Sequence, residues 1–244
     1  MSNIRLDISY DGTRYAGWQV QKNAVTIQQT IESALKKITG HAVKLKGAGR
    51  TDSGVHARNQ VANFRTASEL PLKRIKDALN SRLPSYILIG SLREMPVSFD
   101  SQRSARSKHY RYTVTTSRFV DPFIRHFVTR FSYPLDISAM RKAALNLIGR
   151  RDLKTFQSSG AKEGSTVRTI KKIRVEKNGE LVYIDIWADG FLYNMARAIC
   201  GTLLEIGRGK IPESAIKDIL KKRSRPMAGP TAPAKGLCLM KVEY

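Results

Sequence analysis

Cysteine is scarce in this chain of 244 residues. Its two cysteines, Cys200 and Cys238, lie in apolar runs and lack the close spacing of metal ligands. Isolated cysteines of this kind are typical of buried, reduced thiols and not of a disulfide framework or a structural zinc site. We therefore expect a reducing compartment, the cytoplasm, and no structural metal.

Long apolar stretches are missing as well. No uninterrupted apolar run approaches the length of a membrane span, and the first residues, Met-Ser-Asn-Ile-Arg-Leu-Asp, lack the apolar core of a signal peptide. Hydrophobic residues nevertheless make up 41% of the chain, which argues against disorder. We expect an ordered, soluble protein of one large or two small domains, without a membrane partner.

Acidic residues are strongly outnumbered. The chain has 20 Asp and Glu against 43 Lys and Arg, a formal net charge of +23 and a pI of about 10.3. Such a positive surface suits phosphate backbones or anionic membranes. Because no basic amphipathic tail is set apart from the rest of the chain, nucleic acid is the favoured partner.

One of the few carboxylates has an unusual setting, in the sequence Gly-Arg-Thr-Asp-Ser-Gly-Val-His-Ala from Gly49 to Ala57. Glycines permit positive φ and close approach of a ligand, and a neighbouring cation keeps a carboxylate ionised. An ionised, oriented Asp52 could serve as a nucleophile or a base. The alternative is a β-turn in which Asp52 bonds its own backbone. Arg50 shares a side with Asp52 if the segment is extended, and a solvated arginine is its alternative role.

The order of expected elements is regular in the first part of the chain. Alternation predicts a strand at 4–10, and the next helix, at 26–38, has Thr26 and Gln29 as a capping box and Gly40 as its stop. Further expected elements are strands at 42–46 and 60–65, a helix begun by Pro71 and ended by Pro84, and a strand at 86–92. This βαββαβ order is that of a ferredoxin-like unit.

The later part repeats the order. We expect strands at 109–116, 170–176, 181–187 and 237–243, helices at 138–148 and 191–206, and a short extra helix at 212–222. Residues 8–15 and 186–193 also share four of eight residues in register, which hints at duplication. The prediction is an α+β protein of two ferredoxin-like halves, 1–102 and 103–244, related by pseudo-twofold symmetry. Their sheets would lie side by side around a central basic cleft, a natural ligand site.

Five motifs in this order are similar to one known family. They are Tyr10–Gln19, Gly49–Ala57, Ser107–Tyr112, Asp189–Arg197 and Ala232–Leu237, and together they span nearly the whole chain. They resemble the tRNA pseudouridine synthase A family. The resemblance implies the pseudouridine synthase fold and the isomerisation of uridine to pseudouridine at positions 38–40 of the tRNA anticodon stem-loop. It also implies a homodimer that binds tRNA and needs no cofactor or metal.

The resemblance assigns roles to individual residues. Asp52 matches the catalytic aspartate that attacks the target uridine, and whether base or ribose is attacked first stays open. Arg50 matches a position near the RNA and the displaced base. Arg197 matches the arginine that pairs with the aspartate from the other half of the molecule; an arginine in an apolar helix needs a partner if buried, or its head reaches solvent.

The remaining pocket residues also come from the motifs. Tyr110 matches the tyrosine that stacks on the target base, although Tyr110 and Tyr112 share a strand face and a core-packing role suits one of them. Leu237 matches the leucine of the opposite pocket wall and would otherwise be an ordinary strand residue. His56 has no defined partner in the sequence and is expected to be structural.

Reaching a uridine in a folded RNA requires its extrusion into a pocket, and basic residues supply the binding energy. Candidates for phosphate contacts, each with a solvated surface role as its alternative, are Arg14, Lys22, Arg58, Arg103, Arg106, Lys108 and Arg111.

Two other classes of protein were weighed. A non-catalytic RNA-binding protein with tandem ferredoxin-like sheets would show clustered aromatics on central strands, which this sequence lacks. A nuclease that uses Asp52 to hold Mg²⁺ would need converging carboxylates, and Asp7, Asp11, Asp100 and Asp189 fall in no ligand-spaced motif. The chain departs from the resembled family at Arg58-Asn59 and at Asn63, which stands where a histidine is usual. The chain is also at the short end of that family, so we expect trimmed connecting loops, and its target range is a more open question than its chemistry.

Overall fold

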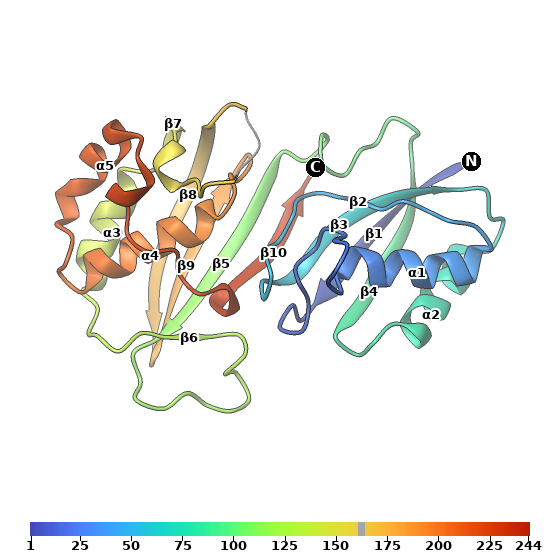
Figure 1. Cartoon of the computed structure of the whole chain (residues 1–244), viewed down its shortest axis with the longest axis horizontal. Helices are drawn as coiled ribbons and strands as arrows, with labels where there is room; N and C mark the ends of the chain where they lie inside the picture. The colour runs from blue at the N-terminus through green and yellow to red at the C-terminus, as the bar shows by residue number, and fades with distance from the viewer. Residues whose placement is uncertain (161–163) are drawn as a thin grey trace. The chain divides into compact units, whose positions relative to one another are not determined.

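The computed structural model describes residues 1–160 and 164–244, and these form two compact units (Figure 1). The first unit comprises Met1–Arg106 and Leu239–Tyr244, and the second comprises Ser107–Cys238. The first unit thus extends four residues beyond the expected border at 102 and also includes the last six residues. Two hydrogen bonds hold those six: the Tyr244 hydroxyl donates to the Ser101 carbonyl at 2.8 Å, and the Arg106 amide donates to the Glu243 carbonyl at 2.8 Å.

The first unit has the expected βαββαβ order. Its elements are β1 (Ser2–Tyr10), α1 (Ile27–Thr39), β2 (Lys46–Gly47), β3 (His56–Thr66), α2 (Leu72–Arg82), β4 (Ile87–Met95) and the later part of β10 (Leu237–Glu243). The sheet order is β4-β1-β3-β10, and β2 also pairs with β3. The strand expected at 42–46 is wrong, because only Lys46 and Gly47 pair with β3.

Local signals set the helix boundaries of this unit. The Thr26 hydroxyl accepts a hydrogen bond from the Gln29 amide at 3.3 Å, and Gly40 ends α1 in the left-handed conformation with φ 78°. Helix α2 begins directly after Pro71. Figure 1 shows both helices beside the strands of this unit, and α2 contacts β4 and α1. The apolar residues that the two helices bury include Ile27, Ile31, Leu35, Ile75 and Leu79.

The second unit is also built from antiparallel strands and helices. Its elements are β5 (Ser107–Thr115), β6 (Thr129–Arg130), α3 (Ile137–Leu145), β7 (Gly149–Asp152), β8 (Val167–Asn178), β9 (Leu181–Ala188), α4 (Met195–Gly207), α5 (Ile216–Lys222) and the first two residues of β10. The sheet order is β5-β9-β8-β7, with the short β6 parallel to β5. Helix α4 is the core helix, since almost all of its residues are buried.

Helix α4 begins later than its apolar pattern predicts. We expected it from Phe191, but Asn194 has φ 60°, a left-handed conformation that cannot continue a helix, so the first turn starts at Met195. Among the described residues, no helix is both long enough and apolar enough to cross a membrane.

The chain is therefore an α+β protein, as expected. The hint of duplication between residues 8–15 and 186–193 is wrong, however. Ile8 lies on the first strand of its unit, whereas Ile186 lies on β9, which follows β8 in the second unit. Both segments run from a strand into a loop ahead of a helix, and this shared local demand accounts for their similarity without structural equivalence.

Candidate active site

The loop from Gly49 to Val55 places Asp52 just before β3. The carbonyl of Asp52 accepts the amide of Val55 at 3.1 Å, and Gly54 has φ 76°. These are the marks of a tight turn with glycine at its third position. The turn considered from the sequence thus exists, and the backbone carbonyl of Asp52 closes it.

Close approach of the segment before α1 fixes this loop. A Cβ on Gly17 would lie 2.5 Å from the Thr51 carbonyl oxygen and 3.0 Å from the Asp52 carbonyl carbon, and Gly17 itself has φ 89°. The Trp18 amide donates to the Thr51 carbonyl at 3.0 Å, and the hydroxyls of Tyr10 and Thr51 are 2.8 Å apart. Contacts from Gly17, Trp18 and Tyr10 therefore hold the chain next to the Asp52 side chain.

The far side of the turn is anchored in the same way. The Tyr15 carbonyl accepts the Ser53 hydroxyl at 3.2 Å and the Gly54 amide at 3.4 Å. Nδ1 of His56 accepts the Gly12 amide at 3.1 Å and lies 3.1 Å from an Asp11 carboxylate oxygen. His56 is buried and joins two loops, in agreement with its expected structural role.

The basic candidates of the first unit share one property, exposure to solvent; they are Arg14, Lys22, Arg50, Arg58, Arg103 and Arg106. Arg50 is on the Asp52 loop. The Arg14 guanidinium lies 4.5 Å from the centre of the Tyr86 ring, a cation–π arrangement. Arg103 belongs to a different part of the unit, the segment after β4.

In the second unit, Arg197 on α4 is tied to the segment that leads into β10. Its Nε donates to the Ala232 carbonyl at 2.8 Å, and its Nη1 donates to the Asn194 side-chain oxygen at 2.9 Å. The Ala232 amide donates back to the Arg197 carbonyl at 3.2 Å. The guanidinium is half-buried with a fixed direction, and the fork geometry of arginine makes this possible.

The two tyrosines of β5 have different surroundings. Tyr110 is buried and meets Phe191 edge to face, with the ring centres 4.8 Å apart. Tyr112 is fully enclosed, and its hydroxyl is in hydrogen-bond contact with the Thr129 hydroxyl at 2.8 Å and the Pro233 carbonyl at 3.1 Å. Burial raises the pKa of Tyr112 above its usual value. Both tyrosines are buried, and Tyr112 is the more enclosed of the two.

Leu237 begins β10 and is buried. The segment before it is fastened to α4 at a second point, where the Gly229 amide donates to the Thr202 hydroxyl at 2.9 Å. Leu237 and the Arg197 guanidinium thus depend on the same stretch of chain, residues 229–237.

The last two basic candidates, Lys108 and Arg111, are less exposed than those of the first unit. Burial lowers the pKa of Lys108, and the nearby Arg168 lowers it further against the opposing effect of Asp189. Arg111 donates from Nε and Nη2 to the two oxygens of Asp185, at 2.9 and 3.0 Å.

Sequence analysis missed the residues that position the candidates. The close approach of Gly17, the Ala232 carbonyl and the ring of Phe191 gave no local signal. Asn194 precedes α4, but its side chain makes no capping hydrogen bond and instead bonds Arg197 and Ser158.

Four other carboxylates have structural partners. Asp7 bonds Arg5, Asp11 bonds Thr13, Asp100 bonds Lys46, and Asp189 accepts the Thr169 amide. Within the part of the chain that the structure describes, no three His, Cys, Asp or Glu side chains are grouped to hold a metal ion.

Comparison with known proteins defines the class. The family model described as tRNA pseudouridine synthase matches residues 8–102 and 143–244, which is most of the chain. The chain belongs to the tRNA pseudouridine synthase family, a family of isomerases.

Its relatives within this family share one name, tRNA pseudouridine synthase A. Those from Thermoanaerobacter sp. (strain X514) and Acetivibrio thermocellus are each 47% identical over 244 residues, covering 100% of both chains. The relative from Geotalea uraniireducens is 45% identical over the same length. Among solved structures, a chain of the archaeal box H/ACA sRNP Nop10-Cbf5 complex matches with a TM-score of 0.36 and 12% identity, over 92% of this chain and 59% of that chain. This last likeness is too weak to bear on the assignment.

Proposed function

We propose that this protein isomerises uridine to pseudouridine at positions 38–40 of the tRNA anticodon stem-loop, with Asp52 as the nucleophile. The observation that carries the proposal is the fixed turn at Asp52. There Gly17 approaches the backbone of Thr51 and Asp52 closely, and the Trp18 amide donates to the Thr51 carbonyl. A nucleophile gains most from such fixed placement, because its attack geometry is set before the substrate arrives.

The reaction rearranges bonds without changing composition. The bond between C1′ of the ribose and N1 of uracil breaks, and a bond between C1′ and C5 forms. The proton on C5 leaves to solvent, and N1 gains a proton. Asp52 provides the electron pair of the first attack and is regenerated when the product is released.

The other site residues have roles that follow from their surroundings. Arg197, held by Ala232 and Asn194, is the cation proposed to pair with the carboxylate of Asp52. Tyr110, braced by Phe191, stacks on the uracil. Leu237 gives the pocket an apolar wall, and Arg50 contacts the RNA beside the target.

The partner is tRNA. Moving the target uridine out of the RNA stack into the active site costs free energy, and contacts between the protein and the RNA phosphates supply it. Such contacts come from the exposed cations Arg14, Lys22, Arg58 and Arg106. The protein acts in the cytoplasm as a homodimer. Sedimentation of the purified protein with and without tRNA tests the dimer.

The decisive experiment uses unmodified tRNA tritiated at C5 of uracil and counts tritium released to water. Wild type should release tritium, and Asp52→Asn, which keeps the shape of the side chain, should release none. Asp77→Asn is the matched control, because Asp77 is an exposed carboxylate on α2 and its loss should leave the rate unchanged. Mapping of the product would place the pseudouridines at 38–40. No release by wild type, with tRNA binding intact, would leave an RNA-binding protein in place of an enzyme.

A further inference from the structure

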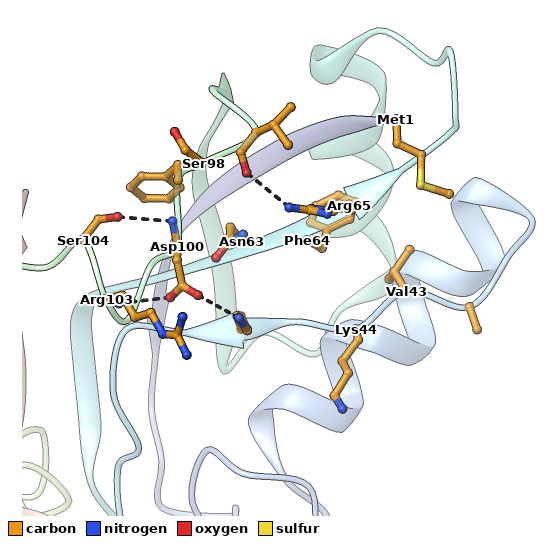
Figure 2. Close-up of a pocket in the computed structure, with 14 residues that line it drawn as sticks. Met1, Val43, Lys44, Asn63, Phe64, Arg65, Ser98, Asp100, Arg103 and Ser104 are labelled. Carbon is orange, nitrogen blue, oxygen red and sulfur yellow. Dashed lines mark hydrogen bonds and ion pairs between the residues drawn. The ribbon is translucent and has the colours of Figure 1, made fainter.

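The first unit contains a pocket of about 810 Å³ at the end of β3 opposite the Asp52 loop (Figure 2). Met1 and three stretches of chain form it: the segment 42–46 around the start of β2, residues 63–65 of β3, and the segment 97–104 that follows β4. All three belong to the same compact unit. None of the roles proposed above uses this pocket.

The pocket is strongly basic. Its lining includes four cations, Lys44, Lys46, Arg65 and Arg103, and one carboxylate, Asp100, so its formal charge is four minus one, +3. The other lining residues are uncharged side chains, among them the serines at 98 and 104. A concave surface of one charge concentrates counter-ions, and here these are anions.

The single carboxylate, Asp100, is bound by groups next to it in the pocket wall. Asp100 accepts hydrogen bonds from Lys46 Nζ at 2.7 Å and from the amides of Gln102 and Arg103 at 2.9 and 3.0 Å. Burial opposes the charge of Asp100, but the bonds from Lys46 and the two amides outweigh it and hold the pKa below its usual value. Lys46 therefore balances Asp100.

Three cations remain for a ligand: Lys44, Arg65 and Arg103. All three side chains are exposed. Arg65 uses one guanidinium nitrogen for the Val97 carbonyl at 3.2 Å, which aims the rest of its fork. In residues 1–160 and 164–244, no carboxylate forms an ion pair with any of the three.

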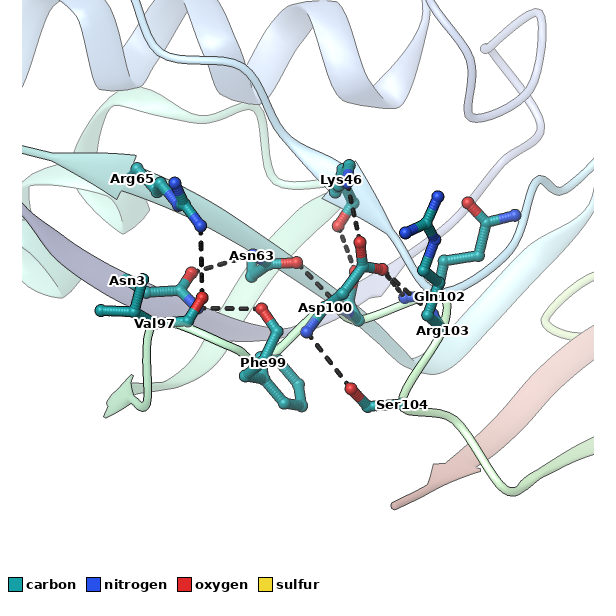
Figure 3. A network of polar contacts seen from close by, with 11 residues as sticks. Asn3, Lys46, Asn63, Arg65, Val97, Phe99, Asp100, Gln102, Arg103 and Ser104 are labelled. Atoms are coloured by element: carbon teal, nitrogen blue, oxygen red, sulfur yellow. Dashed lines mark hydrogen bonds and ion pairs between the residues drawn. The ribbon is translucent and has the colours of Figure 1, made fainter.

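A buried amide network keeps the pocket wall rigid (Figure 3). Asn63 donates to the Asn3 side-chain oxygen at 2.9 Å and accepts the Ser101 amide at 3.0 Å. Asn3 donates to the carbonyls of Pro96 and Phe99, both at 2.9 Å. Asn63 and Asn3 together thus fasten the 96–101 segment to β1 and β3.

The pocket is far from the Asp52 loop along one strand. Asp52 precedes His56 at the start of β3, and the pocket begins at Asn63 near its end. At about 3.3 Å per residue, the two are roughly 25 Å apart. Phosphates next to a uridine bound at Asp52 cannot reach this distance, so a ligand here belongs to another part of the RNA.

We propose that this pocket is a second RNA-contact site, in which Lys44, Arg65 and Arg103 hold backbone phosphates of the tRNA outside the anticodon arm. The proposal rests on the proposed function for the identity of the RNA. Phosphate contacts of this kind position the RNA and set affinity, and they do not read bases. The pocket therefore favours whole tRNA over its isolated anticodon arm.

The test compares two RNAs, full-length tRNA and the isolated anticodon stem-loop, by binding and by tritium release. In the triple variant Lys44→Gln, Arg65→Gln, Arg103→Gln, the Kd for full-length tRNA should rise roughly tenfold or more, and the salt slope of log Kd should fall by about 2 to 3. Binding of the stem-loop should be unchanged. At saturating tRNA the rate of tritium release should also match wild type.

A charge-matched variant controls for the loss of three cations. Lys36→Gln, Lys73→Gln, Arg74→Gln removes exposed cations of α1 and α2 in the same unit, and it should affect both RNAs little. Equal weakening of both RNAs by the pocket variant, or an effect no larger than that of the control, would overturn the proposal. Because binding is read separately from tritium release, an inactive wild type would refute the enzyme and leave this comparison intact.

Discussion

Arg111 and Asp185 face each other across β5 and β9 and form a two-pronged ion pair, with Nε to Oδ1 at 2.9 Å and Nη2 to Oδ2 at 3.0 Å. The Asp185 side chain is 1% exposed and also contacts His109 Nε2 at 2.6 Å. A buried carboxylate needs such partners, because an unpaired charge in the interior is strongly unfavourable. These contacts therefore indicate that Arg111 stabilises the fold of the second unit, in preference to the alternative role of binding phosphate.

The first prediction concerns Arg111→Gln. Loss of the fork leaves Asp185 with His109 alone and should lower the free energy of unfolding by about 2 kcal/mol, less than a fully buried pair because the arginine is 35% exposed. The Kd for tRNA at low temperature should change less than twofold. Urea unfolding and filter binding measure the two effects. Arg174→Gln breaks only the exposed pair with Glu176 and should cost less than about 0.5 kcal/mol. A large loss of tRNA affinity in a stable Arg111 variant would restore its role as a phosphate ligand.

Acid should weaken the second unit through Asp185. Burial opposes ionisation of this carboxyl, but hydrogen bonds from His109 and Arg111 outweigh it and hold its pKa below the usual value. Its contribution to stability is therefore present above the unfolded-state pKa of about 4 and is lost as the pH falls through the lower folded-state pKa. Urea unfolding of wild type should show a decline below about pH 4 that Asp185→Asn shows less steeply. Asn at position 185 should itself be destabilising at pH 7. Parallel pH profiles for the two proteins would contradict the assignment.

Local signals explain which parts of the fold could be predicted. Thr26, Gly40, Pro71 and Pro84 act within a few residues of the helix ends that they set, so α1 and α2 were predicted closely. The start of α4 was not, because the left-handed conformation of Asn194 goes with contacts to Arg197 and Ser158, which sequence periodicity cannot show.

The site shows the same division. Asp52 was recognisable because glycines and an arginine surround an acid in a chain poor in acids. The groups that fix it and its companions are a glycine chosen for lack of a Cβ, a backbone carbonyl at 232 and a ring at 191. These roles cannot be predicted from residue type, because each depends on contact with a chain segment that is distant in the sequence. The strands β6, of two residues, and β7, of four residues, are likewise too short to leave a recognisable sequence pattern.

Tyr110→Phe should separate packing from chemistry. The ring keeps its edge-to-face contact with Phe191, so the melting temperature should stay within about 2 °C of wild type. If the hydroxyl assists removal of the C5 proton, kcat for tritium release should fall at least about tenfold with an unchanged Kd for tRNA. Tyr110→Leu should in addition lose about 1 to 3 kcal/mol of stability through the lost ring contacts. Tyr133→Phe, at a half-exposed tyrosine, serves as the control and should have no effect. Full activity of Tyr110→Phe would confine the residue to stacking.

Arg197→Lys tests whether direction matters as well as charge. Lysine keeps the cation but cannot reach the Ala232 carbonyl and the Asn194 side chain with one planar group. We expect kcat to fall about a hundredfold or more, with a stability loss of about 1 kcal/mol. Arg208→Lys is a control at the other end of α4, where the arginine pairs with Glu205, and it should keep the kcat of wild type. Wild-type kcat in Arg197→Lys would show that a positive charge at this position is sufficient.

Two glycines of similar conformation allow the tightest test of the Asp52 turn. Gly17 and Gly40 have φ 89° and 78°, so alanine should cost each about 1 kcal/mol in backbone strain. Gly40 has nothing within 4 Å of a built Cβ, whereas at Gly17 the Cβ would lie 2.5 Å from the Thr51 carbonyl oxygen. Gly17→Ala must therefore push the Thr51-Asp52 backbone aside and should lower kcat by about tenfold or more, in addition to a larger loss of stability. Gly40→Ala should lose stability alone. Equal kcat in the two variants, measured by tritium release below both melting temperatures, would show that catalysis does not depend on how the chain holds Asp52.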